Sequence, residues 1–144
     1  MNIQIIAVGQ KMPKWVDLAF EEYAKRLPRQ HSVELSCIAT ASRKSGQTRQ
    51  RIQQQEAQKI EMKIKPGSLL IALDEKGKHW STLEWANQYR LWLQQYSQVN
   101  FVIGGPDGLD PALVKRANQT IALGRMTMPH GLARVVLIEQ LYRV

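Results

Sequence analysis

Residues 68–103 read SLLIALDEKGKHWSTLEWANQYRLWLQQYSQVNFVI, and this stretch decides the fold class. SLLIAL (68–73) and VNFVI (99–103) are short, nearly continuous apolar runs, which are typical of buried strands. Between them, Ser81 and Glu84 have the spacing of a capping box, in which the side chain of each residue accepts a hydrogen bond from the backbone amide of the other. This pattern predicts that a helix starts here and joins two parallel strands as a crossover connection.

The rest of the chain continues the alternation of strand and helix. Turn-forming residues separate the elements, and residues 74–80 (DEKGKHW) are expected to form such a turn. Further strands are predicted at 3–8, 33–38 and 120–123, and further helices at 13–27 and 51–64, from Asp110 and from Pro129. The chain therefore reads as one α/β domain over residues 1–144, with a mainly parallel sheet of five to six strands and helices on both faces.

The charge of the chain is concentrated in one segment. The 144 residues carry 20 Lys and Arg against 12 Asp and Glu, a net charge of +8, which points to a polyanionic partner such as nucleic acid. Residues 40–65 hold seven basic and two acidic residues, which is +5 of that excess. The segment predicts a basic loop followed by a polar-faced helix. Two readings stay open: a solvated helix with a mobile entry loop, or an RNA contact through the phosphates made by Arg43, Lys44, Arg49 and Arg51.

Several classes of protein are disfavoured. No apolar run approaches the roughly 20 residues of a membrane span, and the N-terminal residues lack the basic region of a secretory signal. Cys37 is the single cysteine, which fits a reducing compartment, and no His or Cys lies near it at the spacing of metal ligands. We therefore expect a cytoplasmic protein without a membrane partner and without a metal.

Three predicted strands end in segments suited to ligand binding. In open α/β sheets, ligands bind beyond the carboxyl ends of the strands. These ends are Leu73-Asp74, the glycine-rich segment 104–108 (GGPDG) and the segment 124–130 (GRMTMPH). The glycine-rich segment alone is a weak signal, because a tight turn explains it equally well. His130 is the histidine to follow, because it begins a helix beside a glycine-bearing loop.

The last helix is apolar on almost every side. Leucine, isoleucine and valine dominate LARVVLIEQLYRV (132–144) and leave only a narrow polar strip. A helix of this kind is buried nearly all round. The pattern favours packing both on the sheet and against a second copy of the chain, although burial between the sheet and neighbouring helices is the simpler alternative.

Three segments taken together resemble the RlmH family of SPOUT methyltransferases, which modify N3 of a pseudouridine in large-subunit ribosomal RNA. They are IIAVGQKMPKWV (5–16), VIGGPDGL (102–109) and LGRMTMPHGLARVVLIEQLYR (123–143). The resemblance follows the whole chain in order. It implies a homodimer that acts on the assembled ribosome, and a trefoil knot in the C-terminal part, about residues 68–144, that holds S-adenosylmethionine. The positions that match the cofactor site of the family are Leu73, Gly104, Gly105, Leu123, Gly124, Arg125, Met126, Thr127 and Met128.

A catalytic set follows from the chemistry that the resemblance implies. N3 of pseudouridine is an imide nitrogen that is mostly protonated at neutral pH, so a base or a stabiliser of the anion is needed. His130 is the candidate base, Arg134 and Arg143 are candidate stabilisers, and Glu139 is placed to orient Arg143 four residues further on. An ordinary surface ion pair is an equally good reading of Glu139 and Arg143.

The sequence departs from the family pattern at two places. Ala122-Leu123-Gly124 stands where the family usually has Ser-Leu-Ser, so two hydroxyl groups are missing. Family members also usually continue past Tyr142-Arg143 to a Tyr-His segment near the active site, whereas this sequence ends at Val144. An alternative function is therefore a non-catalytic RNA- or ribosome-binding module that retains a vestigial cofactor pocket.

Overall fold

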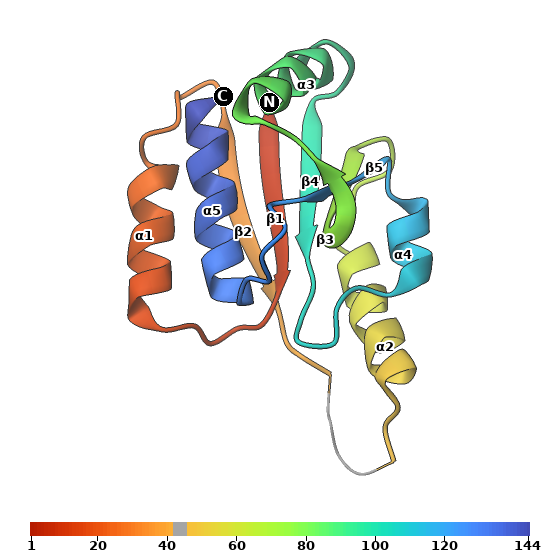
Figure 1. Cartoon of the computed structure of the whole chain (residues 1–144). Coiled ribbons are helices and arrows are strands. Elements are labelled where there is room, and N and C mark those ends of the chain that lie inside the picture. The colour runs from red at the N-terminus through yellow and green to blue at the C-terminus, as the bar shows by residue number, and fades with distance from the viewer. Residues whose placement is uncertain (42–45) are drawn as a thin grey trace.

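A computed structural model of the chain describes residues 1–41 and 46–144 (Figure 1). Within these residues five strands form one sheet in the order β2-β1-β4-β3-β5, and every neighbouring pair is parallel. The strands are β1 (Asn2–Val8), β2 (Ser32–Ile38), β3 (Leu69–His79), β4 (Gln98–Ile103) and β5 (Gln119–Ala122). The predicted α/β class and parallel sheet are confirmed.

Helices cover both faces of the sheet. The helices are α1 (Lys14–Ala24), α2 (Arg49–Glu61), α3 (Thr82–Gln95), α4 (Pro111–Arg116) and α5 (His130–Arg143). One core lies between the sheet and α1, α3 and α5, and it contains an aromatic cluster around Trp85, Trp92 and Phe101. A second core lies between the opposite face and α2 and α4. Figure 1 shows α1 beside α5 on one side of the sheet, and α2 with α4 on the other.

Local sequence signals set the starts of the helices. Both hydrogen bonds of the predicted capping box are present, since the Glu84 amide donates to Ser81 and the Ser81 amide donates to the Glu84 carboxylate. Asp110 caps α4 by accepting from the Ala112 amide. Helix α2 begins at Arg49, two residues before the predicted start. The Thr48 hydroxyl accepts from the Arg51 amide and so caps the first turn of the helix.

The prediction of a simple turn at residues 74–80 is wrong. β3 continues to His79, and Ile121 of β5 is in register with both Leu73 and Lys78. The strand therefore pairs with β5, loops out and returns to the same neighbour. Composition alone pointed to a turn because residues 74–78 are charged or glycine, whereas the second pairing depends on β5, more than 40 residues later in the chain.

The apolar helix α5 is buried largely within its own chain. It packs beside α1 and contacts α3 and β4, and Leu137, Ile138 and Leu141 are buried in the sheet core. Leu132 and Tyr142 keep substantial exposure. Intramolecular packing thus accounts for one side of the helix, and a second copy remains a prediction for the other. None of the helices seen in the described residues has the length and apolarity required to cross a membrane.

We predict that Gly77→Ala destabilises the fold. A Cβ atom at Gly77 would lie 2.6 Å from the Ile121 amide nitrogen, so β3 and β5 would have to separate. The expected loss in the free energy of unfolding is about 1–3 kcal/mol, as for other overpacked sites, measured by urea denaturation. Gly124→Ala is the control, since its Cβ would meet only Met128 at an ordinary 3.7 Å. Equal stabilities of the two variants would contradict the prediction.

Candidate active site

One large hollow of about 1430 Å³ lies at the carboxyl ends of β4 and β5 and at Leu73, where the first pairing of β3 with β5 ends. It is lined by the loop within β3, by the loops that follow β4 and β5, by the first turns of α2 and α5, and by one side of α4. All three segments singled out in the sequence reach it. Parallel strands bring their carboxyl ends to one edge of the sheet, which is why segments distant in sequence meet here.

Apolar side chains and glycine backbone form the inner wall of the hollow. Leu73, Ile103 and Leu123 contribute the apolar surface. The glycine-rich segment turns tightly, with the Gly108 amide donating to the Gly105 carbonyl at 2.9 Å. A Cβ atom at Gly105 would lie 3.0 Å from Val8 Cγ1, so a larger residue would push this loop off the end of β1.

The predicted cofactor residues come together almost completely. Leu73, Gly104, Gly105, Leu123, Gly124, Met126, Thr127 and Met128 all line the hollow, whereas Arg125 does not. Met126 is 77% exposed, so its side chain stands at the rim. The wall offers backbone groups for a polar edge and leucine side chains for a flat ring, which is the mixture typical of small-molecule sites.

Sequence reasoning missed most of the other side of the hollow. Asp74, Glu75 and Lys76 line it from the loop that β3 makes before it returns to β5. Arg49 and Gln53 reach it from α2, and Val114 from α4. Asp74 was expected at a ligand-binding strand end, because it directly follows a predicted strand, and it lines the hollow. Nothing in the sequence pointed to Gln53 or Val114, because they reach the hollow only through the packing of α2 and α4 on the sheet.

His130 lies in the wall of the hollow at the first residue of α5. Its Nδ1 is buried and has no hydrogen-bond partner among the described residues. Burial, and then the positive charge of nearby Arg134, lower the pKa of His130 below its usual 6.5. The imidazole is therefore mainly neutral at pH 7 and keeps a nitrogen lone pair for accepting a proton.

Arg134 is 1% exposed and does not line the hollow. Its guanidinium donates from Nη2 to the Gly9 carbonyl at 2.6 Å and from Nη1 to Cys37 Sγ at 3.5 Å. The side chain thus joins α5 to the ends of β1 and β2. In this arrangement it acts on the site through the placement of α5 and through its charge near His130.

Glu139 and Arg143 lie far along α5 from His130. At 1.5 Å per residue, they are about 14 Å and about 20 Å further along the helix axis. They form an ion pair with each other, and Glu139 Oε2 also accepts from the Gln140 side chain at 3.2 Å. Neither lines the hollow of its own chain, so their catalytic role remains a prediction.

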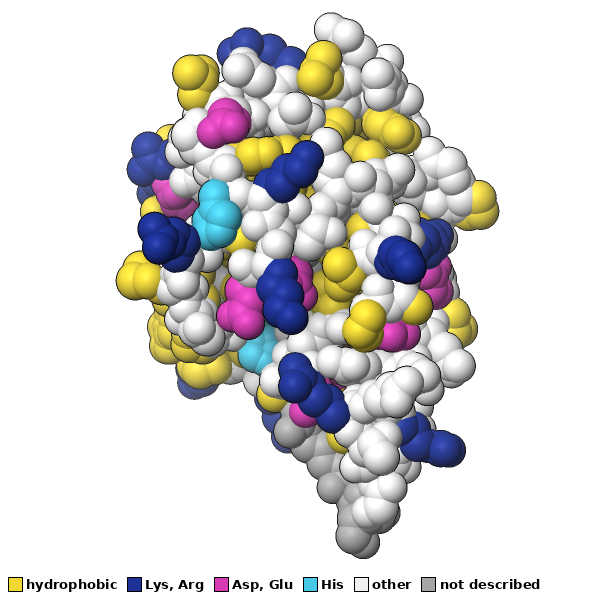
Figure 2. All heavy atoms as spheres, turned by 45° about the vertical axis from the view of Figure 1, so that its right-hand side comes forward, with side chains coloured by type: hydrophobic (Ala, Val, Ile, Leu, Met, Phe, Trp, Pro, Cys, Tyr) yellow, Lys and Arg dark blue, Asp and Glu magenta, His cyan; other side chains and the backbone are white. Residues whose placement is uncertain are grey.

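Two of the four predicted RNA-contact residues lie in the described part of the chain. Arg49 and Arg51 lie in the first turn of α2, whereas Arg43 and Lys44 fall outside the described residues. Arg49 Nε donates to the Asp107 carbonyl of the glycine-rich segment at 3.1 Å. Figure 2 shows Lys and Arg side chains spread among acidic and apolar ones on this face, without a single large basic patch.

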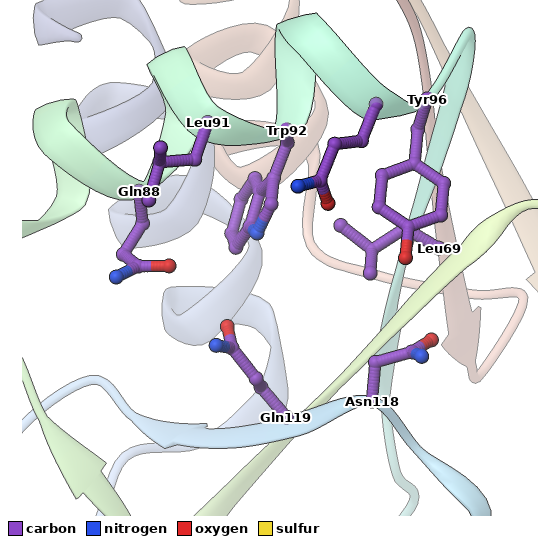
Figure 3. A pocket seen from close by; sticks show the side chains of 8 residues that line it. Leu69, Gln88, Leu91, Trp92, Tyr96, Asn118 and Gln119 are labelled. Carbon is purple, nitrogen blue, oxygen red and sulfur yellow. The ribbon is translucent and has the colours of Figure 1, made fainter.

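A smaller pocket of about 190 Å³ lies at the opposite ends of β3 and β5 (Figure 3). Gln88, Leu91 and Trp92 of α3, with Tyr96 just after it, face Asn118 and Gln119 across the pocket. Its volume is below the range of roughly 300–1,000 Å³ usual for ligand sites. The larger hollow, where the strand ends and His130 meet, is the better candidate site.

Comparison with known proteins covers the whole chain. Residues 1–144 match the family model described as "Predicted SPOUT methyltransferase". A protein of Paraburkholderia phymatum named "Ribosomal RNA large subunit methyltransferase H" is 44% identical over 143 residues, which is 99% of this chain and 92% of that protein. Proteins of the same name from Burkholderia lata and Burkholderia cenocepacia are each 45% identical over the same extents.

Proposed function

The chain belongs to the RlmH family of SPOUT methyltransferases, and from this premise we propose that it transfers a methyl group from S-adenosylmethionine to N3 of a pseudouridine in large-subunit ribosomal RNA. One observation carries the proposal: the strand-end segments that match the family's cofactor site surround a single hollow, and His130 stands in its wall. The assembled ribosome is the proposed substrate and the cytoplasm the proposed location.

The residues of the hollow suit S-adenosylmethionine. Leu73 and Leu123 offer apolar surface for the adenine ring, and the backbone of the glycine-rich segment approaches without side chains in the way. Asp74 and Glu75 add carboxylates to the same wall, next to Lys76. When bound, the cofactor supplies an activated methyl group. The knot expected for the C-terminal part remains part of the proposal.

His130 is the proposed base. It takes the proton from N3 of the pseudouridine, and the resulting nitrogen anion is the methyl acceptor. Its burial supports this role, because a neutral imidazole is available at physiological pH. Arg134 is proposed to assist by holding α5 to Gly9, which keeps His130 in the wall. The family relationship also extends the proposal to Glu139 and Arg143, whose contribution would have to come from a second subunit.

The partner subunit is proposed to cover α1 and α5. Trp15 and Leu18 on α1 are 53% and 66% exposed, and Leu132 and Tyr142 on neighbouring α5 are 38% and 43% exposed. Large apolar side chains on two adjacent helices favour a protein interface. A homodimer with this interface would bury the remaining apolar side of α5.

Methyl transfer tests the function directly. Large ribosomal subunits that lack the modification are incubated with the protein and S-adenosylmethionine carrying a labelled methyl group. We expect label in the large-subunit RNA, at N3 of one pseudouridine after digestion and mass spectrometry. Cofactor binding in calorimetry without any incorporation of label would contradict catalysis.

The pH dependence of methyl transfer tests His130. We expect the rate to rise as His130 loses its proton, with a midpoint below pH 6.5, and to be flat above it, because the pKa is lowered. His130→Gln should remove this rise of the rate with pH and reduce the rate by roughly 10²–10⁴-fold. The control is His79→Gln, an exposed residue of β3. An unchanged profile in His130→Gln would exclude His130 as the base.

Oligomeric state tests the interface. Leu18→Glu places a charge in the proposed contact, so we expect a shift from dimer to monomer in analytical ultracentrifugation. Leu83→Glu is the matched control, because Leu83 is similarly exposed at 69% but lies on α3. A wild-type monomer, or a dimer unaffected by Leu18→Glu, would show that α1 is not the interface.

A further inference from the structure

The glycine-rich segment is held from outside by helix α2. The carbonyl oxygen of Asp107 accepts two hydrogen bonds, from Gln53 Nε2 at 2.7 Å and from Arg49 Nε at 3.1 Å. Both donors lie on one side of α2, four residues apart. Asp107 is the middle of the turn that the Gly108 amide closes onto the Gly105 carbonyl. The two donors therefore fix the turn at its tip.

A third residue of the same helix lies near the base of the segment. Glu56 is 3% exposed, and its Oε2 accepts from the Ala41 amide at 3.0 Å. Its Oε1 lies 3.4 Å from where a Cβ atom of Gly105 would be. Arg49 and Gln53 thus bond the tip of the segment, whereas Glu56 lies near Gly105 and bonds the Ala41 amide instead.

We infer that Gln53 and Arg49 are positioning residues: they hold the glycine-rich segment in the conformation that binds the cofactor. The inference rests on the proposed function. It assigns Arg49 a different task from the RNA contact expected from its charge, because its Nε is already bonded to the loop whose backbone is proposed to bind the cofactor. A loop held in its binding conformation loses less entropy when a ligand arrives, which favours affinity.

Substitutions at Gln53 test this with little change to the helix. Gln53→Glu has the same size but no donor for the Asp107 carbonyl. We expect the Kd for S-adenosylmethionine in calorimetry to rise roughly fivefold to tenfold, as for the loss of one hydrogen bond. The KM for S-adenosylmethionine should rise with it, with kcat and the KM for ribosomal subunits unchanged. Gln53→Lys, which retains a donor, should recover most of the affinity.

The neighbouring Gln54 provides the matched control. It is exposed on the same turn of α2, and Gln54→Ala should leave both constants unchanged. Arg49→Ala should behave like Gln53→Glu. If Arg49→Ala raises only the KM for ribosomal subunits, or if Gln53→Glu binds S-adenosylmethionine like the wild type, the inference is overturned.

Hydrogen exchange separates this inference from the proposed function. The Gly108 amide is protected by its bond to the Gly105 carbonyl, and no cofactor is needed to follow it. We expect its exchange to be several-fold faster in Gln53→Glu than in Gln54→Ala. Equal exchange in both variants overturns the inference alone, whereas a wild type that binds no S-adenosylmethionine overturns the proposed function.

Discussion

The backbone contact between Gly77 and β5 is the constraint on which the site depends. Because Gly77 has no side chain, β3 returns to within van der Waals contact of Thr120 and Ile121 after its loop. This contact lets β3 pair a second time with β5, which lies at the edge of the sheet. Asp74, Glu75 and Lys76 loop out between the two pairings and become a wall of the hollow. One close approach thus allows the second pairing and leaves the loop between the two pairings as a side of the site.

The hollow is assembled from the two helix layers, which pack on opposite faces of the sheet. From one layer, α5 supplies His130, and the buried Arg134 secures that helix to Gly9. From the other, α2 reaches over the strand ends and holds the Asp107 carbonyl. The sheet makes this possible because its strands are parallel and end together. Helix α2 consequently belongs to the proposed cofactor site as well as to the face expected to meet RNA.

Most elements were predictable because their signals are local. A capping box, an N-cap followed by proline and short apolar runs depend on neighbouring residues, and each appears where it was expected. The prediction failed at residues 74–79, whose strand pairing depends on a distant segment. The catalytic set was harder for the same reason. His130 was found in the wall of the hollow, but the sequence did not reveal that Arg134 is buried and does not line it.

The sequence by itself determined the α/β class, the order of the elements and the strand-end segments that form the site, because periodicity, capping and turn residues act over a few positions. Its motifs also identified the family. Only the tertiary structure decided what each segment faces: the second pairing of β3, the burial of Arg134, and the hydrogen bonds from α2 to the glycine-rich segment. These arise from contacts between residues 40 or more positions apart, and whether a charged side chain is bonded to a backbone carbonyl or left in water is settled by such contacts.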